Sequence, residues 1–263
     1  MSWLADRSLW LLLLMFVGGL AAVAIGGQWA ARRIFGESGP SAIAVATPLM
    51  PAFGTAFAVL AAFAVSNAAT GLRDAQLDVG KEATAAAKLA WAATGAGEDG
   101  RQVQIDLQSY LDATLATEWR DIDRISAGQG GAFDELTALE QSTRTLAAGE
   151  QLGTPQRAEL LSALDDLSGA RRGRFASATP IAGGVVALLA LSAIAMMLNV
   201  AVLTLGRERR VSLTLIGLVV VTGMSIACVV TLGGPFSGSF GAGARPLLDV
   251  ANDLRSGRFT IGP

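Results

Sequence analysis

The chain has 263 residues, of which 52% are hydrophobic and only 16% are charged, and its formal net charge is -2. Ordinary soluble domains carry about 25% charged residues, so this composition is typical of a membrane protein. The near-neutral charge provides no basic field for binding nucleic acid. The sequence contains no histidine, which removes the commonest metal ligand and near-neutral proton carrier, and we expect no cofactor.

Four long stretches of the sequence carry no charged residue. Each supplies the roughly 20 apolar residues that a helix needs to cross ~30 Å of hydrocarbon. We expect transmembrane helices at 8–31, 41–66, 178–205 and 211–232. The first stretch is longer than the typical 7–15-residue core of a secretory signal, so we interpret it as a retained span. The sequence therefore predicts an all-α membrane protein with its spans in a two-plus-two arrangement.

The second predicted span differs from the other three in its small side chains. Its many alanines would let neighbouring membrane helices approach closely. Phe53, Phe57 and Leu60, with Ala64 further on, fall on one face of this helix. By default such a face packs against a core or lipid. In an oligomer where this span lines an axis, the same face would form a hydrophobic neck that gates by dewetting.

The charged segment 67–174 between the second and third spans has a helical pattern throughout. Apolar residues recur near the 3.6-residue period from Val103 to Ile122, and again at 133–146 and 160–167. Residues 68–93 read as a helix that continues from the second span into water. The segment is therefore expected to be a soluble bundle of about four helices. The breaks between them are expected at Gly95–Gly100 and Ala127–Gly131.

The C-terminal part begins with a tight basic turn, Arg207–Arg210, between the third and fourth spans. The tail, 233–263, contains one short amphipathic helix, which we expect to lie near the membrane. Basic short loops favour the cytoplasm. Basic residues also flank the spans on the opposite side, so their counts do not decide the orientation.

A basic cluster, Arg171, Arg172 and Arg174, directly precedes the third span. One interpretation is that it anchors the helix end to lipid headgroups. Alternatively, together with Arg73 it forms a basic vestibule at a pore mouth, where oligomeric symmetry multiplies the charge and concentrates anions.

Two acidic residues of the soluble block, Glu82 and Glu118, stand in amphipathic helices. The plainer interpretation is a buried or half-buried salt bridge with an arginine, which would fix how the helices pack rather than perform chemistry.

An enzyme is not indicated. Gly95–Gly100 matches the G-x-G-x-x-G string, but a helix precedes it, and its two acidic residues would repel phosphate. Without histidine and without a G-x-S-x-G elbow, no constellation for nucleophilic catalysis is visible. Adjacent carboxylates such as Asp165 and Asp166 are typical of a solvated helix face.

The layout of two spans, a helical block, two spans and a short tail resembles the uncharacterised bacterial bestrophin-like membrane family. Two departures are Ser66-Asn67-Ala68, where the family usually has aromatic residues, and Gly234, where it tends to have an acid. The short matching motifs are Glu82-Ala83, Tyr110, Glu118-Trp119, Arg171 to Arg174 leading to Pro180, and Pro235-Phe236-Ser237-Gly238.

Similarity to bestrophins proper implies a pentameric, anion-selective channel, with the second span lining the pore and the helical block in the cytoplasm. Our leading hypothesis is thus a homo-oligomer of the cell membrane that crosses it several times and passes chloride or another small anion. The alternative is a non-transporting accessory subunit that docks other membrane subunits through its acidic helical block. The lack of charges in the spans favours this alternative, because transport pathways usually contain intramembrane polar or ionisable groups.

Overall fold

The computed structural model describes residues 9–35, 39–119, 131–179, 183–205, 210–236 and 240–259, which contain helices and turns but no strand. They divide between two compact units. The predicted span start at Ser8, most of the basic turn at 207–210 and most of the break at 127–131 lie outside the described residues. So do Ile122, Pro180 and Ser237-Gly238 of the predicted patterns.

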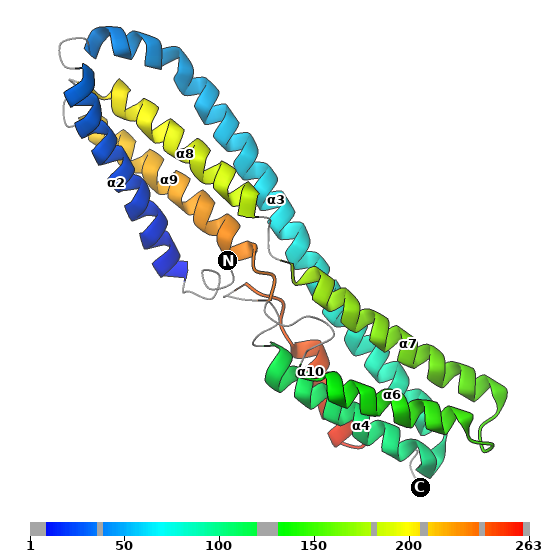
Figure 1. The fold of residues 1–263 in the computed structure, drawn as a ribbon. Coiled ribbons are helices and arrows are strands. Elements are labelled where there is room, and N and C mark those ends of the chain that lie inside the picture. The colour runs from blue at the N-terminus through cyan, green and yellow to red at the C-terminus, as the bar shows by residue number, and fades with distance from the viewer. Residues whose placement is uncertain are drawn as a thin grey trace. The chain divides into compact units, whose positions relative to one another are not determined.

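The first unit comprises residues 1–70 and 180–241. It contains α2 (Leu9–Phe35), the N-terminal part of α3 (Gly39–Thr94), α8 (Gly183–Leu203) and α9 (Arg210–Leu232). Each of these four helices is long and apolar enough to cross a membrane, as the sequence predicts. Helix α2 lies against both α8 and α9 (Figure 1).

The core of the first unit is apolar. Leu12 and Ala24 of α2, Phe57 of α3, Met197 of α8 and Val229 of α9 all belong to one buried cluster. Because lipid is as apolar as these side chains, close van der Waals packing must hold the helices together. The approach of α2 to α9 is so close that a Cβ at Gly223 would lie 2.6 Å from the Cγ2 of Val17.

Helix α3 is one continuous helix of 56 residues, which confirms that the second span extends into the soluble block. Pro48 and Pro51 lie inside it. Its C-terminal part ends at a tight corner, where a Cβ at Gly100 would lie only 1.9 Å from the carbonyl oxygen of Ala93. Only glycine fits this corner, which is formed by the short 3-10 helix η2 (Gly97–Gly100).

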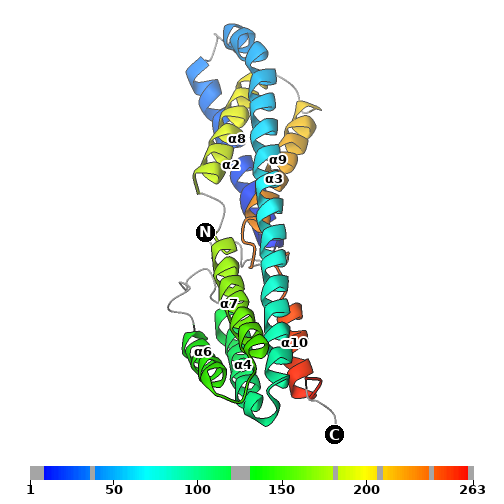
Figure 2. The same cartoon turned by 90° about the vertical axis from the view of Figure 1, so that its right-hand side faces the viewer.

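The second unit comprises residues 71–179 and 242–263 (Figure 2). Its apolar residues at helical spacing, such as Val103, Leu107 and Leu111, are fully buried, as their period predicts. Helix α6 lies against both α4 and α7. Besides the rest of α3, the unit contains α4 (Arg101–Ala113), the π-helical segment η3 (Thr114–Glu118), α6 (Phe133–Ala148), α7 (Thr154–Ser177) and α10 (Arg245–Arg255).

The predicted amphipathic helix of the tail exists as α10, but its expected place near the membrane is wrong. It packs against α4 and belongs to the second unit. Its apolar face, including Leu247 and Ala251, is buried there. An amphipathic stripe shows that one face of a helix is covered, whether lipid or protein covers it.

Candidate functional site

The predicted hydrophobic neck lies inside the chain's own core. Phe57 is only 7% exposed and belongs to the buried cluster of the first unit, and Phe53 and Leu60 pack against that cluster. A side chain in this position cannot line an axis between subunits. The structure therefore favours core packing, the default reading of this face, and corrects the neck interpretation.

A different face of α3 is exposed. Its residues follow one another by three or four positions, the mean spacing of about 3.6 that keeps them on one side of a helix. We call this row the α3 stripe. It consists of Pro48, Ala52, Thr55, Val59, Ala62, Ser66, Thr70, Arg73, Leu77, Lys81, Thr84, Lys88 and Trp91, all of which are exposed.

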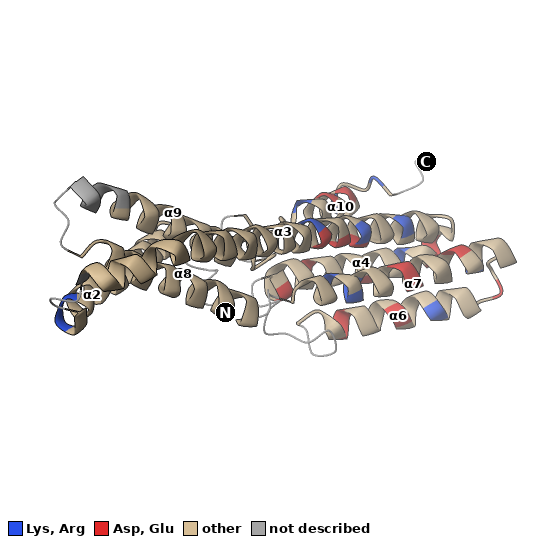
Figure 3. Cartoon of the chain, turned by 90° about the horizontal axis from the view of Figure 1, so that it is seen from above, with Lys and Arg blue, Asp and Glu red and all other residues tan. Residues whose placement is uncertain are grey.

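The part of the stripe in the first unit differs from the exposed faces of the other spans. Those faces carry large apolar side chains, such as Trp10 of α2, Leu191 of α8 and Val221 of α9. The stripe offers mainly small or polar side chains, and Asn67 is exposed beside it. Figure 3 shows that α2, α8 and α9 carry no charged residue along their described lengths except the arginines at the end of α2 and the start of α9.

The second unit buries an ionic network between α3, η3 and α7. Arg174 joins two acids: its Nε donates to Glu82 Oε2 at 2.5 Å, and its Nη2 donates to Glu118 Oε2 at 2.7 Å. Arg171 donates to the other oxygen of Glu118. All four side chains are at most 3% exposed, which confirms the predicted buried salt bridge.

Tyr110 extends this network to α4. Its hydroxyl donates to Glu82 Oε1 at 2.5 Å. Burial, together with the nearby charge of Glu82, raises the pKa of Tyr110 well above its usual value. The phenol is therefore protonated and serves as a permanent donor to the carboxylate.

Aromatic rings cover the two guanidinium groups. The Cζ atoms of Arg171 and Arg174 each lie 4.9 Å from the ring centroid of Phe175, and that of Arg174 lies 5.9 Å from Trp119. Burial opposes the charge of Arg174, but Glu82 and Glu118 outweigh it and raise the pKa of Arg174. These cations stay charged inside the unit.

The predicted basic vestibule is thus reduced. The charges of Arg171 and Arg174 are enclosed within the bundle and neutralised by Glu82 and Glu118, so they cannot attract ions from water. Arg73 on α3 and Arg172 on α7 are exposed, and the vestibule stays a prediction for these two.

The π-helical segment positions Glu118. Such a segment adds a residue to a helical turn and changes the face on which the following side chain lies. Glu118, its last residue, is fully buried and also accepts a hydrogen bond from the backbone N–H of Ala132. Residue 131 must be glycine here, because a Cβ would lie 2.3 Å from the hydroxyl oxygen of Thr117.

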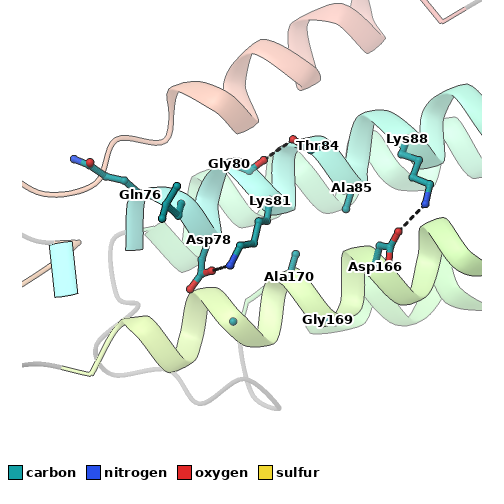
Figure 4. A pocket seen from close by; sticks show the side chains of 12 residues that line it. Gln76, Asp78, Gly80, Lys81, Thr84, Ala85, Lys88, Asp166, Gly169 and Ala170 are labelled. Carbon is teal, nitrogen blue, oxygen red and sulfur yellow. Dashed lines mark hydrogen bonds and ion pairs between the residues drawn. The ribbon is translucent and has the colours of Figure 1, made fainter. Parts of the chain in front are cut away.

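A groove of about 700 Å³ runs between α3 and α7 in the second unit (Figure 4). Two ion pairs cross its rim: Lys81 Nζ to Asp78 Oδ1 and Lys88 Nζ to Asp166 Oδ2, each at 2.7 Å. Its floor is lined by small residues, including Gly80, Gly169, Ala170 and Gly173.

The other predicted positions have structural surroundings. Pro235 and Phe236 are buried directly after α9. The Gly95–Gly100 segment is the expected interhelical corner. Within the described ranges, no three Asp, Glu, His or Cys residues lie close enough to hold a metal ion.

Sequence analysis missed the exposed face of α3 and its lysines. Arg73, Lys81 and Lys88 are the only basic residues of this helix, and their spacing of eight and seven positions places them on one face. That spacing was visible in the sequence. The buried face was misread because an apolar face of a span looks alike whether it meets its own chain, a second copy or lipid.

Comparison with known proteins follows this geometry. A family model described as the Bestrophin-like domain matches residues 18–247. The chain is similar in fold to a mutated bacterial bestrophin homologue from Klebsiella pneumoniae, with a TM-score of 0.68 and 14% identity over 95% of this chain and 100% of that chain.

Two further solved structures give the same result. Another structure of a bestrophin homologue from Klebsiella pneumoniae has a TM-score of 0.69 at 14% identity, covering 96% of this chain and 99% of that chain. A structure described as a membrane protein has a TM-score of 0.68 at 15% identity, covering 94% and 97%. At these identities the likeness shows the fold. No curated protein matches the chain.

Proposed function

The chain belongs to the bestrophin-like family, and we propose that it assembles from identical copies into a channel for small anions, with the α3 stripe lining the pore. In this proposal the four candidate helices all cross the cell membrane. The even number of spans then places both chain ends and the helical block on one side, which by analogy with bestrophins is the cytoplasm.

The chemistry of the exposed face of α3 carries this proposal. Thr55, Ser66 and Asn67 are exposed on the first unit. In contact with hydrocarbon, such polar groups would lack partners at a cost of roughly 2–7 kcal/mol each. In a pore they contact water and ions instead. The small side chains between them leave room for a passage or for another copy of α3.

A hydrophobic neck is still available on this exposed face. Val59 and Phe63 lie four residues apart, one above the other, and are 62% and 59% exposed. Repeated around an axis, they would form the apolar constriction that we first assigned to Phe53, Phe57 and Leu60. Such a constriction can gate by dewetting.

Reconstitution of the purified chain into liposomes tests the proposal. We expect chloride flux above that of empty vesicles, and we expect Ser66→Trp to reduce it at least about ten-fold by filling the passage. The matched control is Val221→Trp on the exposed face of α9, which should leave the flux within about two-fold. Absence of flux from the unmodified chain, or equal effects of the two substitutions, would contradict the proposal.

The accessory-subunit alternative makes the opposite prediction. The absence of charged residues along the described spans supports it. If it holds, the chain purifies under mild detergent in a fixed ratio with other subunits, and the chain alone conducts nothing. A symmetric ring of this chain alone that carries flux excludes it.

A further inference from the structure

Charges on α3 are segregated by face. Its basic residues, Arg73, Lys81 and Lys88, all lie on the α3 stripe. None of its acidic residues does, because Asp74, Asp78 and Glu82 each follow a stripe residue by one position, which turns them about 100° around the helix. Equal numbers of positive and negative charges are thus sorted so that the stripe itself carries only cations.

Burial strengthens this separation. The side chain of Lys81 is 68% exposed, whereas that of its partner Asp78 is 14% exposed. Glu82 is fully buried in the network with Arg174. Asp74 is exposed, but on the neighbouring face. At Lys81, therefore, the ammonium group faces water and the carboxylate that holds it is set back.

Lys88 contributes less to the surface charge than Lys81. Its partner Asp166, on α7, is 53% exposed, compared with 45% for Lys88 itself. A carboxylate that reaches water as far as the ammonium group cancels its field there. No ion pair of Arg73 is found among the described residues, so Arg73 and Lys81 are the stronger cations.

We infer that Arg73 and Lys81, with a smaller contribution from Lys88, select the sign of the permeating ion by attracting small anions to the conduction path. This inference rests on the proposed function. The spans themselves bear no charge facing the pore, so discrimination between anions and cations must be exercised outside them. Symmetry repeats each cation around the axis, and summed charges in a confined space enrich counter-ions by roughly 10-fold or more.

Asp78 is a positioning residue in this arrangement. Its Oδ1 accepts a hydrogen bond from Lys81, and its Oδ2 accepts one from Ser177 of α7. Burial opposes ionisation of Asp78, but the hydrogen bonds from Lys81 and Ser177 outweigh it, so its pKa is lowered. The hydrogen bond to Asp78 in turn raises the pKa of Lys81, and the pair stays ionised at neutral pH.

The test is the chloride-to-potassium permeability ratio of the full chain in liposomes, measured from the reversal potential in a potassium chloride gradient. We expect Lys81→Glu and Arg73→Glu to lower this ratio by about five-fold or more while ions still pass. Lys81→Gln should give a smaller decrease. Asp78→Asn should raise the ratio, because it removes a negative charge behind Lys81 and leaves the cation.

A charge-matched control is Arg144→Glu on α6, where Arg144 is exposed but far from α3 in sequence. We expect the ratio to change by less than about two-fold. An unchanged ratio in both Lys81→Glu and Arg73→Glu, with flux preserved, would overturn the inference and leave the channel proposal standing. Equal shifts with Arg144→Glu would also overturn it. No flux from the unmodified chain would overturn both proposals.

Discussion

The two units of the chain bury opposite kinds of side chain. The first unit packs Leu12, Phe57 and Met197 into a core without charge, whereas the second encloses Arg174 and Glu82 at its centre. In a span, a buried charge costs several kcal/mol and shape alone selects the packing. In the soluble unit, a shift of one helix would leave a charge unpaired, so the ionic network selects one register.

Removal of Arg174 should give the largest effect, because it attacks what is particular to the second unit. Arg174→Leu leaves Glu82 and Glu118 buried with one cation between them, and we expect a loss of about 3–5 kcal/mol in the free energy of unfolding. The measurement is thermal or denaturant unfolding of the chain in detergent. The control Arg172→Leu, exposed on the same helix, should change stability by less than about 0.5 kcal/mol. Equal losses would show that the network is not the source of the register.

Removal of Phe57 tests the apolar core of the first unit. Phe57→Ala should destabilise the chain by about 3 kcal/mol, because it leaves a cavity among packed helices. Phe63→Ala, on the exposed face of the same helix, should cost less than about 1 kcal/mol. The same unfolding measurement compares them. A larger loss for Phe63 than for Phe57 would place the second face, and not the first, inside the core.

The smallest of these effects concerns Tyr110 and alkaline pH. Tyr110→Phe removes one hydrogen bond to a carboxylate, which we expect to cost about 2 kcal/mol. In the unfolded chain a phenol loses its proton near pH 10, whereas burial keeps Tyr110 protonated to higher pH. The unfolded state therefore binds fewer protons above about pH 10, and stability falls as the pH rises. This alkaline loss should be weaker in Tyr110→Phe, and an identical pH profile would contradict the assignment.

The sequence predicted elements well where one physical signal dominates. Charge-free length identified the four spans, and the 3.6-residue period identified α4, α6 and α7. It also allowed the inference that Glu82 and Glu118 pair with arginines. It did not identify Arg171 and Arg174, rather than Arg172, as the partners, because the burial of three nearby arginines depends on the exact phase of α7.

Orientation of a face is the part that sequence could not supply. Phe57 and Phe63 are chemically identical, yet one is buried and the other exposed on α3. The same applies to α10, whose apolar face meets α4 instead of lipid. Apolar patterning shows that a face is covered but not by what, and only tertiary packing decides.

Cysteine accessibility tests most directly the claim that the α3 stripe lines an aqueous pore. In a background where Cys228 is replaced by alanine, we would introduce Ala62→Cys on the stripe or Leu191→Cys on the exposed face of α8, and add a charged, membrane-impermeant thiol reagent. The account predicts that the reagent blocks chloride flux through the Ala62→Cys protein and leaves the Leu191→Cys protein unaffected. Persisting flux with Ala62→Cys unreactive, or block through Leu191→Cys instead, would contradict it.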